Sequence, residues 1–194
     1  MIYEPRWKSY CVTTNNPLFS PQQCQMIIEA GRSEPKHNAS VGGGKKGGAT
    51  VDTKTRTSHI SWIPFKKMPD MYKDIETTMK KTNGNHFGFD GMQITEMAQY
   101  TEYPYGGFYD WHMDSDANCI HEPPVRKISM TILLSNPSEF KGGELEFMSG
   151  GNKPKDLLQG QAIFFASFIR HRVAKVTKGV RRSLVMWFGG PSFK

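Results

Sequence analysis

From Met92 to the end of the chain, apolar residues follow a strand-like pattern in short runs that glycine, proline or asparagine interrupts. The runs are, in chain order, MQITEMAQY, VRKISMTILLS, GELEFMSG, QAIFFASFIRHRVAKV and VRRSLVMWFGG. In the second run, Ile128, Met130, Ile132 and Leu134 recur every two residues and therefore share one face of a strand. Because the runs are closely spaced and no helical pattern separates them, they predict an antiparallel sandwich or barrel.

Two helices are expected before the strand-like region. In FSPQQCQMIIEAGRS, Ser20 is the expected N-cap and Pro21 the first helical residue. Its short apolar face consists of Cys24, Ile27, Ile28 and Gly31. In PDMYKDIETTMKKTNG, apolar residues recur every four positions, and Asn83-Gly84 is expected to end the helix. We interpret both helices as a scaffold layer on the β-barrel.

Between these helices lies NASVGGGKKGGATVDTKTRTS, with five glycines and two lysines between Gly42 and Gly48. Such a composition does not hold a packed conformation. The segment is either a flexible surface loop or a lid, assigned to residues 41–49, that orders over bound substrate. Residues 1–194 are expected to form one domain, with a helical support region over 1–90 and the β core over 91–190.

The composition narrows the class of protein. A chain that is 37% hydrophobic and 12% aromatic can bury a core. Cys11, Cys24 and Cys119 include no CxxC pair, which argues against a disulfide framework or zinc knuckle and favours a reducing compartment. The N-terminus lacks an apolar signal region, and no run approaches the ~20 apolar residues of a membrane span. We therefore expect a soluble cytoplasmic protein, in its own cell or a host cell, with no membrane partner.

The formal net charge of +7 is compatible with nucleic-acid binding, with a solubilising surface or with attraction of small anions. The lysine pairs 45–46, 66–67 and 80–81 are scattered along the chain and form no single basic block. Charge alone therefore gives weak support to a nucleic-acid partner.

The stretch YPYGGFYDWHMDSD, residues 103–116, holds the candidate chemistry. Residues two apart in a strand point to the same side, so His112 and Asp114 can both face the interior. Ferrous iron with open positions requires two histidines and one carboxylate. The second histidine is best supplied by His171, which lies within a β-prone run. The other histidines are a loop residue close to His112 and three that precede the strand-like region: His121, His37, His59 and His86.

Arg181 strengthens the case for a metal site. The TKG sequence at 177–179 predicts a turn that joins residues 169–176 and 180–188 in a hairpin. In that hairpin Arg181 would lie roughly 13 Å from His171, at ~3.3 Å per residue. The planar fork of arginine suits a terminal carboxylate, so a short dicarboxylate bound to the metal could reach it. Residue alternation places Arg181 on the same side of its strand as Trp187.

A resemblance to a known family is carried by the segment Tyr103-x-x-Gly106-x-x-Tyr109-x-x-His112-x-Asp114. Together with FKGGELEF, QGQAIFFAS and HRVAKVTKGVRRSLVMWF, it resembles the prolyl 4-hydroxylase branch of the iron(II)/2-oxoglutarate dioxygenases. FSPQQCQMII and TRTSHISWI are similar to that family's N-terminal helix and the strand after its flexible loop. The resemblance implies an α+β, mainly β fold, with a double-stranded β-helix (jelly-roll, cupin-like) core and N-terminal helices packed on one sheet.

The resemblance also implies residue roles. The iron ligands would be His112, Asp114 and His171. Arg181 would bind the distal carboxylate of 2-oxoglutarate, and Tyr103 would hydrogen-bond to the same group. The substrate would be bound by Tyr109, Trp187, Glu96 and Arg126. Collagen-type enzymes usually carry lysine where Arg181 stands, and they tend to have threonine where this chain has Leu145.

The activity implied is that of an Fe(II)- and 2-oxoglutarate-dependent dioxygenase, a peptidyl-prolyl 4-hydroxylase acting on proline in a protein or peptide with release of succinate and CO2. The expected cofactors are Fe(2+), 2-oxoglutarate and O2, with ascorbate as reductant. Alternatives are the same chemistry on a free amino acid or an alkylated nucleic acid, and a non-catalytic or zinc-binding β-barrel module. The ten-residue spacing from His171 to Arg181 matches the prolyl hydroxylase pattern, so we do not expect a nucleic-acid partner.

Overall fold

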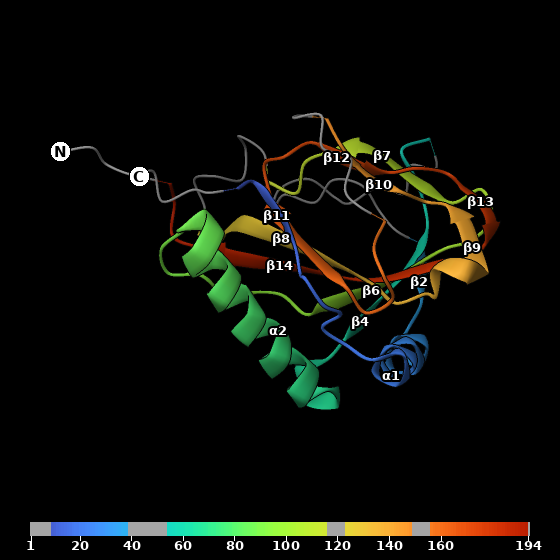
Figure 1. Cartoon of the computed structure of the whole chain (residues 1–194), viewed down its shortest axis with the longest axis horizontal. Coiled ribbons are helices and arrows are strands. Elements are labelled where there is room, and N and C mark those ends of the chain that lie inside the picture. Colours follow the sequence, from blue (N-terminus) through green and yellow to red (C-terminus); the bar gives the residue numbers. More distant parts are fainter. Residues whose placement is uncertain (1–8, 39–53, 116–122, 149–155, 194) are drawn as a thin grey trace.

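The computed structural model describes residues 9–38, 54–115, 123–148 and 156–193. Figure 1 shows a large sheet through the middle of the molecule, with both helices on its outer face and a smaller sheet on the opposite side. Two antiparallel sheets stacked in this way form a double-stranded β-helix, and the protein is mainly β, so the predicted fold class is confirmed.

The strand order of each sheet follows directly from the pairing. The eight-stranded sheet runs β1 (Cys11–Thr13), β11 (Ala162–Ala166), β8 (Val125–Leu133), β14 (Arg181–Gly190), β6 (Ala98–Tyr103), β4 (His59–Ile63) and β2 (His37–Asn38), and β5 (Gln93–Ile94) also pairs with β14. The four-stranded sheet runs β10 (Leu145–Phe147), β12 (His171–Val173), β7 (Phe108–His112) and β3 (Arg56–Thr57). A two-stranded ribbon consists of β13 (Val176–Gly179) and β9 (Phe140–Gly142), the latter preceded by the 3-10 turn η3 (Pro137–Glu139).

Helix α1 (Pro21–Arg32) begins as the sequence predicts. The Ser20 hydroxyl accepts a hydrogen bond from the Gln23 backbone N–H at 3.2 Å, and the Gln23 side chain accepts one from the Ser20 N–H at 2.9 Å, which forms a capping box. The expected apolar face is buried against the large sheet. A Cβ atom on Gly31 would lie 2.3 Å from Cγ of Tyr100, so only glycine lets the helix approach strand β6 this closely.

Helix α2 (Pro69–Thr82) follows the 3-10 turn η1 (Phe65–Lys67). It buries the apolar residues that recur every four positions, namely Met71, Ile75 and Met79. Its end differs from the prediction, because the chain continues past Asn83-Gly84 as a π-helical turn, η2 (Asn83–Phe87). The Asn83 side chain bonds both the N–H and the carbonyl of Phe89, and Phe87 is fully buried. These contacts draw the turn into the core until Gly88, with φ of 70°, ends it.

The main core lies between the helices and the large sheet. The four residues predicted to share a face of the second run, Ile128, Met130, Ile132 and Leu134, are all fully buried there. A second, smaller apolar cluster lies on the other side and involves both sheets. Its buried members are Tyr103, Leu145, Ile163, Phe165, Val173 and Val176.

The hairpin predicted for residues 169–176 and 180–188 is wrong. Strand β12 pairs with β10 and β7 in the small sheet, whereas β14 lies between β8 and β6 in the large sheet. The residues expected to form the turn are part of β13, which pairs with β9 instead. The chain therefore crosses from one sheet to the other, and the distance derived from the hairpin does not apply. Side-chain alternation does not depend on the partner strand, and Arg181 and Trp187 are both buried along β14.

Some expectations fall on residues outside the described ranges, namely the glycine-rich segment 41–49, Cys119 and His121. Within those ranges, Cys11 and Cys24 are free thiols, as the sequence predicts. None of the helices that the structure describes has the length and apolar composition needed to cross a lipid bilayer.

Candidate metal centre

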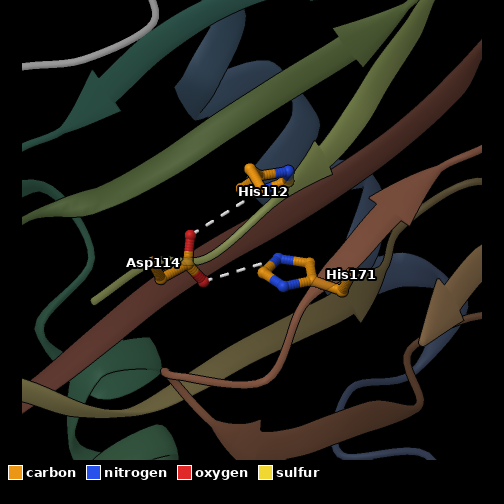
Figure 2. Close-up of side chains that lie close together, drawn as sticks. All are labelled: His112, Asp114 and His171. Atoms are coloured by element: carbon orange, nitrogen blue, oxygen red, sulfur yellow. Dashed lines mark ion pairs between the residues drawn. The ribbon is translucent and has the colours of Figure 1, made fainter. Parts of the chain in front are cut away.

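Three predicted ligands converge at one end of the small sheet (Figure 2). His112 ends β7, Asp114 follows it by two residues, and His171 begins β12. His112 and His171 are direct partners in the β7–β12 ladder, and their ring centroids are 4.2 Å apart. Asp114 Oδ1 lies 3.7 Å from Nε2 of His112, and Oδ2 lies 3.6 Å from Nε2 of His171. These three residues are called the triad below.

Backbone carbonyls fix the orientation of both imidazoles. Nδ1 of His112 is 2.7 Å from the carbonyl oxygen of Asp110, and Nδ1 of His171 is 2.9 Å from that of Ile169. A carbonyl only accepts hydrogen bonds, so each Nδ1 carries the proton and donates it. The lone pair of each Nε2 is therefore directed toward Asp114, as a shared metal ion requires.

His112 and Asp114 also have the protonation states that a metal requires. Burial, followed by the neighbouring His171, lowers the pKa of His112 to about 4, so its imidazole is neutral at physiological pH. Burial alone would raise the pKa of Asp114, but His171, His112 and a hydrogen bond from Ser129 outweigh it and lower that pKa. Two imidazoles and a carboxylate are the donor set of a ferrous site with open positions.

Tyr109 and Arg56 form a stack on the His112 imidazole. The ring of Tyr109 lies parallel to that of His112 with centroids 3.5 Å apart, and the Arg56 guanidinium lies 4.4 Å from the centroid of Tyr109. Arg56 is buried and donates hydrogen bonds to Ser58 at 2.8 Å and to Gln99 at 3.0 Å. Burial raises the pKa of Tyr109 to about 12, which keeps the phenol neutral. Arg56 lies in the TRTS segment, and nothing in that segment's sequence marks it as a site residue.

Arg181 is a buried cation at the other end of the smaller apolar cluster. It is only 2% exposed, and burial lowers its pKa. Its guanidinium lies 5.6 Å from the ring centroid of its cross-strand partner Tyr103, and Nη1 donates to the Ser183 hydroxyl at 3.1 Å. Among the described residues no carboxylate lies within ion-pair distance of its guanidinium, although Tyr103 and Glu144 favour the charged form from further away. A buried charge without a directly contacting counterion is costly, so this position suits an anionic ligand.

The smaller apolar cluster connects Arg181 with the triad. Tyr103 contacts the guanidinium at one end, and at the other end the ring of Phe165 meets that of His171 with centroids 4.6 Å apart. Tyr109, which stacks on His112, packs against the same cluster. The order is thus a cation at Arg181, then apolar side chains, then the triad. An elongated ligand with two polar ends and an apolar middle would match this order.

Gly143 shapes the position of Arg181 and was not identified as a site residue from the sequence. Its φ is +72°, and a Cβ atom there would lie 2.7 Å from Cδ of Arg181. The glycine pair in FKGGELEF therefore does more than form a turn, because the arginine side chain occupies the space beside Gly143. In the sequence, the feature that could have identified Gly143 is the glycine pair directly before the strand-like residues of FKGGELEF.

The remaining predicted residues form a second group. Arg126 makes a bidentate ion pair with Glu96, with Nε donating to Oε1 at 2.5 Å, and its guanidinium lies 4.1 Å from the ring centroid of Trp187. The Trp62 ring lies 6.1 Å from that of Trp187. The buried indole N–H of Trp187 makes no hydrogen bond of ordinary geometry with the described residues. It is nevertheless close enough to Asp114 to help lower the pKa of that carboxyl. Glu96, Arg126 and Trp187 therefore lie together beside the triad. Tyr109, which was predicted with them, instead stacks on His112.

Residues 98–189, which include the triad and Arg181, match the family described as the 2OG-Fe(II) oxygenase superfamily. This segment is a 2OG-Fe(II) oxygenase domain. The family match thus covers strands β6 to β14, the part of the chain that builds both ends of the site.

Curated relatives of this oxygenase domain are PKHD-type hydroxylases. That of Colwellia psychrerythraea is 32% identical over 123 residues, which cover 61% of this chain and 55% of the relative. That of Synechococcus sp. (strain CC9902) is 37% identical over 83 residues, which cover 42% of this chain and 36% of the relative. The chain thus spans about half or less of the length of these curated relatives.

Solved structures of prolyl hydroxylases share the fold. The viral collagen prolyl hydroxylase of Paramecium Bursaria Chlorella virus-1, in its 2OG complex, has a TM-score of 0.70 and 22% identity and covers 94% of this chain and 97% of its own. A prolyl-4-hydroxylase of Pseudomonas putida has a TM-score of 0.71 and 17% identity, with 95% of each chain covered. At these identities the likeness concerns the backbone arrangement.

Proposed function

We propose that the protein is an Fe(II)- and 2-oxoglutarate-dependent dioxygenase that hydroxylates proline in a protein or peptide, as a peptidyl-prolyl 4-hydroxylase. The observation that carries this proposal is the buried guanidinium of Arg181, which forms no ion pair with a described carboxylate and which contacts the same apolar cluster as the triad. A zinc hydrolase or a non-catalytic barrel would leave this costly cation without a purpose.

The residues present fit both cofactors. Nε2 of His112, Nε2 of His171 and the carboxylate of Asp114 would hold Fe(II), since both imidazoles are already oriented for a metal and the pKa values of His112 and Asp114 are lowered. Arg181 and the Tyr103 hydroxyl would bind the distal carboxylate of 2-oxoglutarate with charge-assisted hydrogen bonds. When bound, iron and 2-oxoglutarate supply with O2 the oxidising chemistry that yields succinate, CO2 and a hydroxylated product.

The chain itself contributes orientation and exclusion of water. The backbone carbonyls of Asp110 and Ile169 keep both imidazoles aimed at one point, so little reorganisation is needed when the metal binds. The buried apolar side chains between Arg181 and the triad keep the cofactor site dry, which strengthens the interaction of the guanidinium with a carboxylate.

A peptide substrate is supported by the group beside the triad. Trp187 and Tyr109 offer aromatic surface for a proline ring, and the guanidinium of Arg126 is held by Glu96 in a fixed position for contact with peptide carbonyl groups. A structural neighbour from Trichoplax adhaerens, with a TM-score of 0.70 and 17% identity, is a prolyl hydroxylase in complex with a hypoxia inducible factor peptide fragment. Ascorbate as reductant and a cytoplasmic location belong to the same proposal.

The test is turnover of 2-oxoglutarate with Fe(II) and ascorbate in the presence of proline-containing peptides, free proline or methylated oligonucleotides. We expect peptides to stimulate succinate formation and to gain the mass of one oxygen atom on proline. Asp114→Ala should abolish both signals, whereas the control Arg182→Met, which alters a neighbour paired with Glu102, should retain them. Stimulation by methylated oligonucleotides alone would contradict the proposed substrate and favour the nucleic-acid alternative.

A further inference from the structure

Two buried serines lie behind the carboxylate of Asp114. Ser129 belongs to β8 and Ser167 directly follows β11, and both are completely inaccessible to solvent. The Ser129 hydroxyl donates to Oδ2 of Asp114 at 2.6 Å, and the two serine hydroxyls are 2.9 Å apart. A carboxylate only accepts, so the single Ser129 proton goes to Asp114, and Ser167 must be the donor to Ser129.

The backbone of Ser167 holds Asp114 from a second direction. Its carbonyl accepts hydrogen bonds from the N–H groups of Asp114 at 3.0 Å and Ser115 at 3.1 Å, and its own N–H donates to the Lys127 carbonyl at 3.0 Å. Two residues further on, Ile169 provides the carbonyl that orients His171. The short turn between β11 and β12 therefore contacts two of the three triad residues.

The neighbours of Ser129 in the sheet show that its position is not an ordinary core position. Across the ladders it is the direct partner of Phe165, which contacts His171, and of Trp187, which adjoins Asp114. A hydroxyl among these large side chains is costly to bury unless it makes a specific hydrogen bond. Its two partners are the carboxylate and the second serine.

We propose that Ser129 and Ser167 are positioning residues that hold Asp114 as a one-oxygen metal ligand, with Oδ2 retained by the hydroxyl pair and Oδ1 presented to the ion. This inference rests on the proposed function, because it concerns how the same site binds Fe(II). A carboxylate held by one oxygen leaves more of the metal's coordination positions for 2-oxoglutarate and O2 than one that binds through both.

The test measures Mn(II) binding by calorimetry and by electron paramagnetic resonance, with neither 2-oxoglutarate nor peptide present. Loss of such an outer hydrogen bond typically weakens metal affinity by about 10- to 100-fold, and we expect Ser129→Ala to raise the Kd for Mn(II) by this factor. Ser167→Ala should raise it less, since it removes only the partner of Ser129. In Ser129→Ala the Mn(II) spectrum should also change, because Oδ2 is free to reach the ion.

The matched control is Ser61→Ala, which removes another buried strand hydroxyl, one that donates to the Gly31 carbonyl at 2.5 Å. It should lower the melting temperature without altering Mn(II) affinity. If Ser129→Ala does not fold, Ser167→Ala keeps the test available, because the Ser167 hydroxyl has Ser129 as its only hydrogen-bond partner among the described residues. Wild-type Mn(II) affinity and an unchanged spectrum in the serine variants would overturn this inference alone. A wild-type protein that binds no Mn(II) would instead overturn the proposed function.

Discussion

Replacing Arg181 with methionine should change cofactor affinity and stability in opposite directions. Methionine is unbranched and of adaptable shape, so it can occupy the buried position without the charge. The Arg181 side chain is 2% exposed, and its only hydrogen bond within the described residues goes to the Ser183 hydroxyl. The cofactor-free protein therefore bears most of the desolvation cost of this cation, and 2-oxoglutarate would supply a counterion in direct contact.

The two magnitudes follow from the same contacts. Two charge-assisted hydrogen bonds to the distal carboxylate, at about 1.5–3 kcal/mol each, amount to about 3–6 kcal/mol. Arg181→Met should thus raise the Kd for 2-oxoglutarate by about 10²- to 10⁴-fold. Exchange of buried charged groups for apolar ones is often neutral or stabilising by about 1–4 kcal/mol, so the cofactor-free variant should melt at the same or a higher temperature.

The assay is calorimetric titration of 2-oxoglutarate into protein loaded with Mn(II), combined with thermal unfolding with and without the cofactor. Arg182→Met is the control, since the adjacent Arg182 pairs with Glu102 at 3.1 Å and should leave the Kd for 2-oxoglutarate unchanged. An unaltered Kd in Arg181→Met would remove Arg181 from the cofactor site. A lower melting temperature of the cofactor-free variant would show that the guanidinium is stabilised by a partner, contrary to our reasoning.

Three further predictions address the surrounding structure. Gly143→Ala should weaken 2-oxoglutarate binding by about 5- to 150-fold in calorimetry, because the new methyl group meets Arg181 and overpacking costs about 1–3 kcal/mol. An unchanged Kd would show that the Arg181 side chain moves aside without cost. Mn(II) at 100 times its Kd should stabilise the fold by about 2.7 kcal/mol in thermal unfolding, reversibly with a chelator, and no shift would argue against a metal site. Burial opposes ionisation of Glu102, but hydrogen bonds from Tyr100, Arg32 and Arg182 outweigh it and lower the pKa of this carboxyl. Its contribution to stability is therefore present above the ordinary glutamate pKa of about 4.3 and is lost as pH falls through the lower pKa of the folded protein. Glu102→Gln should therefore flatten the acid limb of unfolding free energy against pH, and an unchanged limb would contradict the assigned network.

Local sequence patterns predicted the local structure well. The alternation of Ile128, Met130, Ile132 and Leu134 marks a buried strand face whatever the partner strands are, and the capping residues of α1 act within one turn of chain. The spacing of His112 and Asp114 is likewise local. The choice of His171 depended on its place in a β-prone run, and its ladder partner is His112.

These local patterns do not reveal which strands pair with one another. The TKG sequence at 177–179 has the composition of a turn, but β13 is extended because β9 is available to pair with it, and sequence periodicity does not report the partner. Similarly, Arg56 is an ordinary polar residue in sequence and becomes part of the site only because β3 pairs with β7 and places Arg56 opposite Tyr109. The π-helical turn after α2 also arises from a tertiary contact, the burial of Phe87.

The direct pairing of His112 with His171 has a consequence for how iron supply and folding are linked. A slip of β12 by one residue against β7 would turn the second imidazole to the outer face and dismantle the site, so an ion bound there selects a single alignment of the two strands. Metal scarcity would then act on the protein before catalysis begins, by loosening the pairing between the two middle strands of the small sheet and shortening the lifetime of the chain in a cell that degrades partly unfolded proteins.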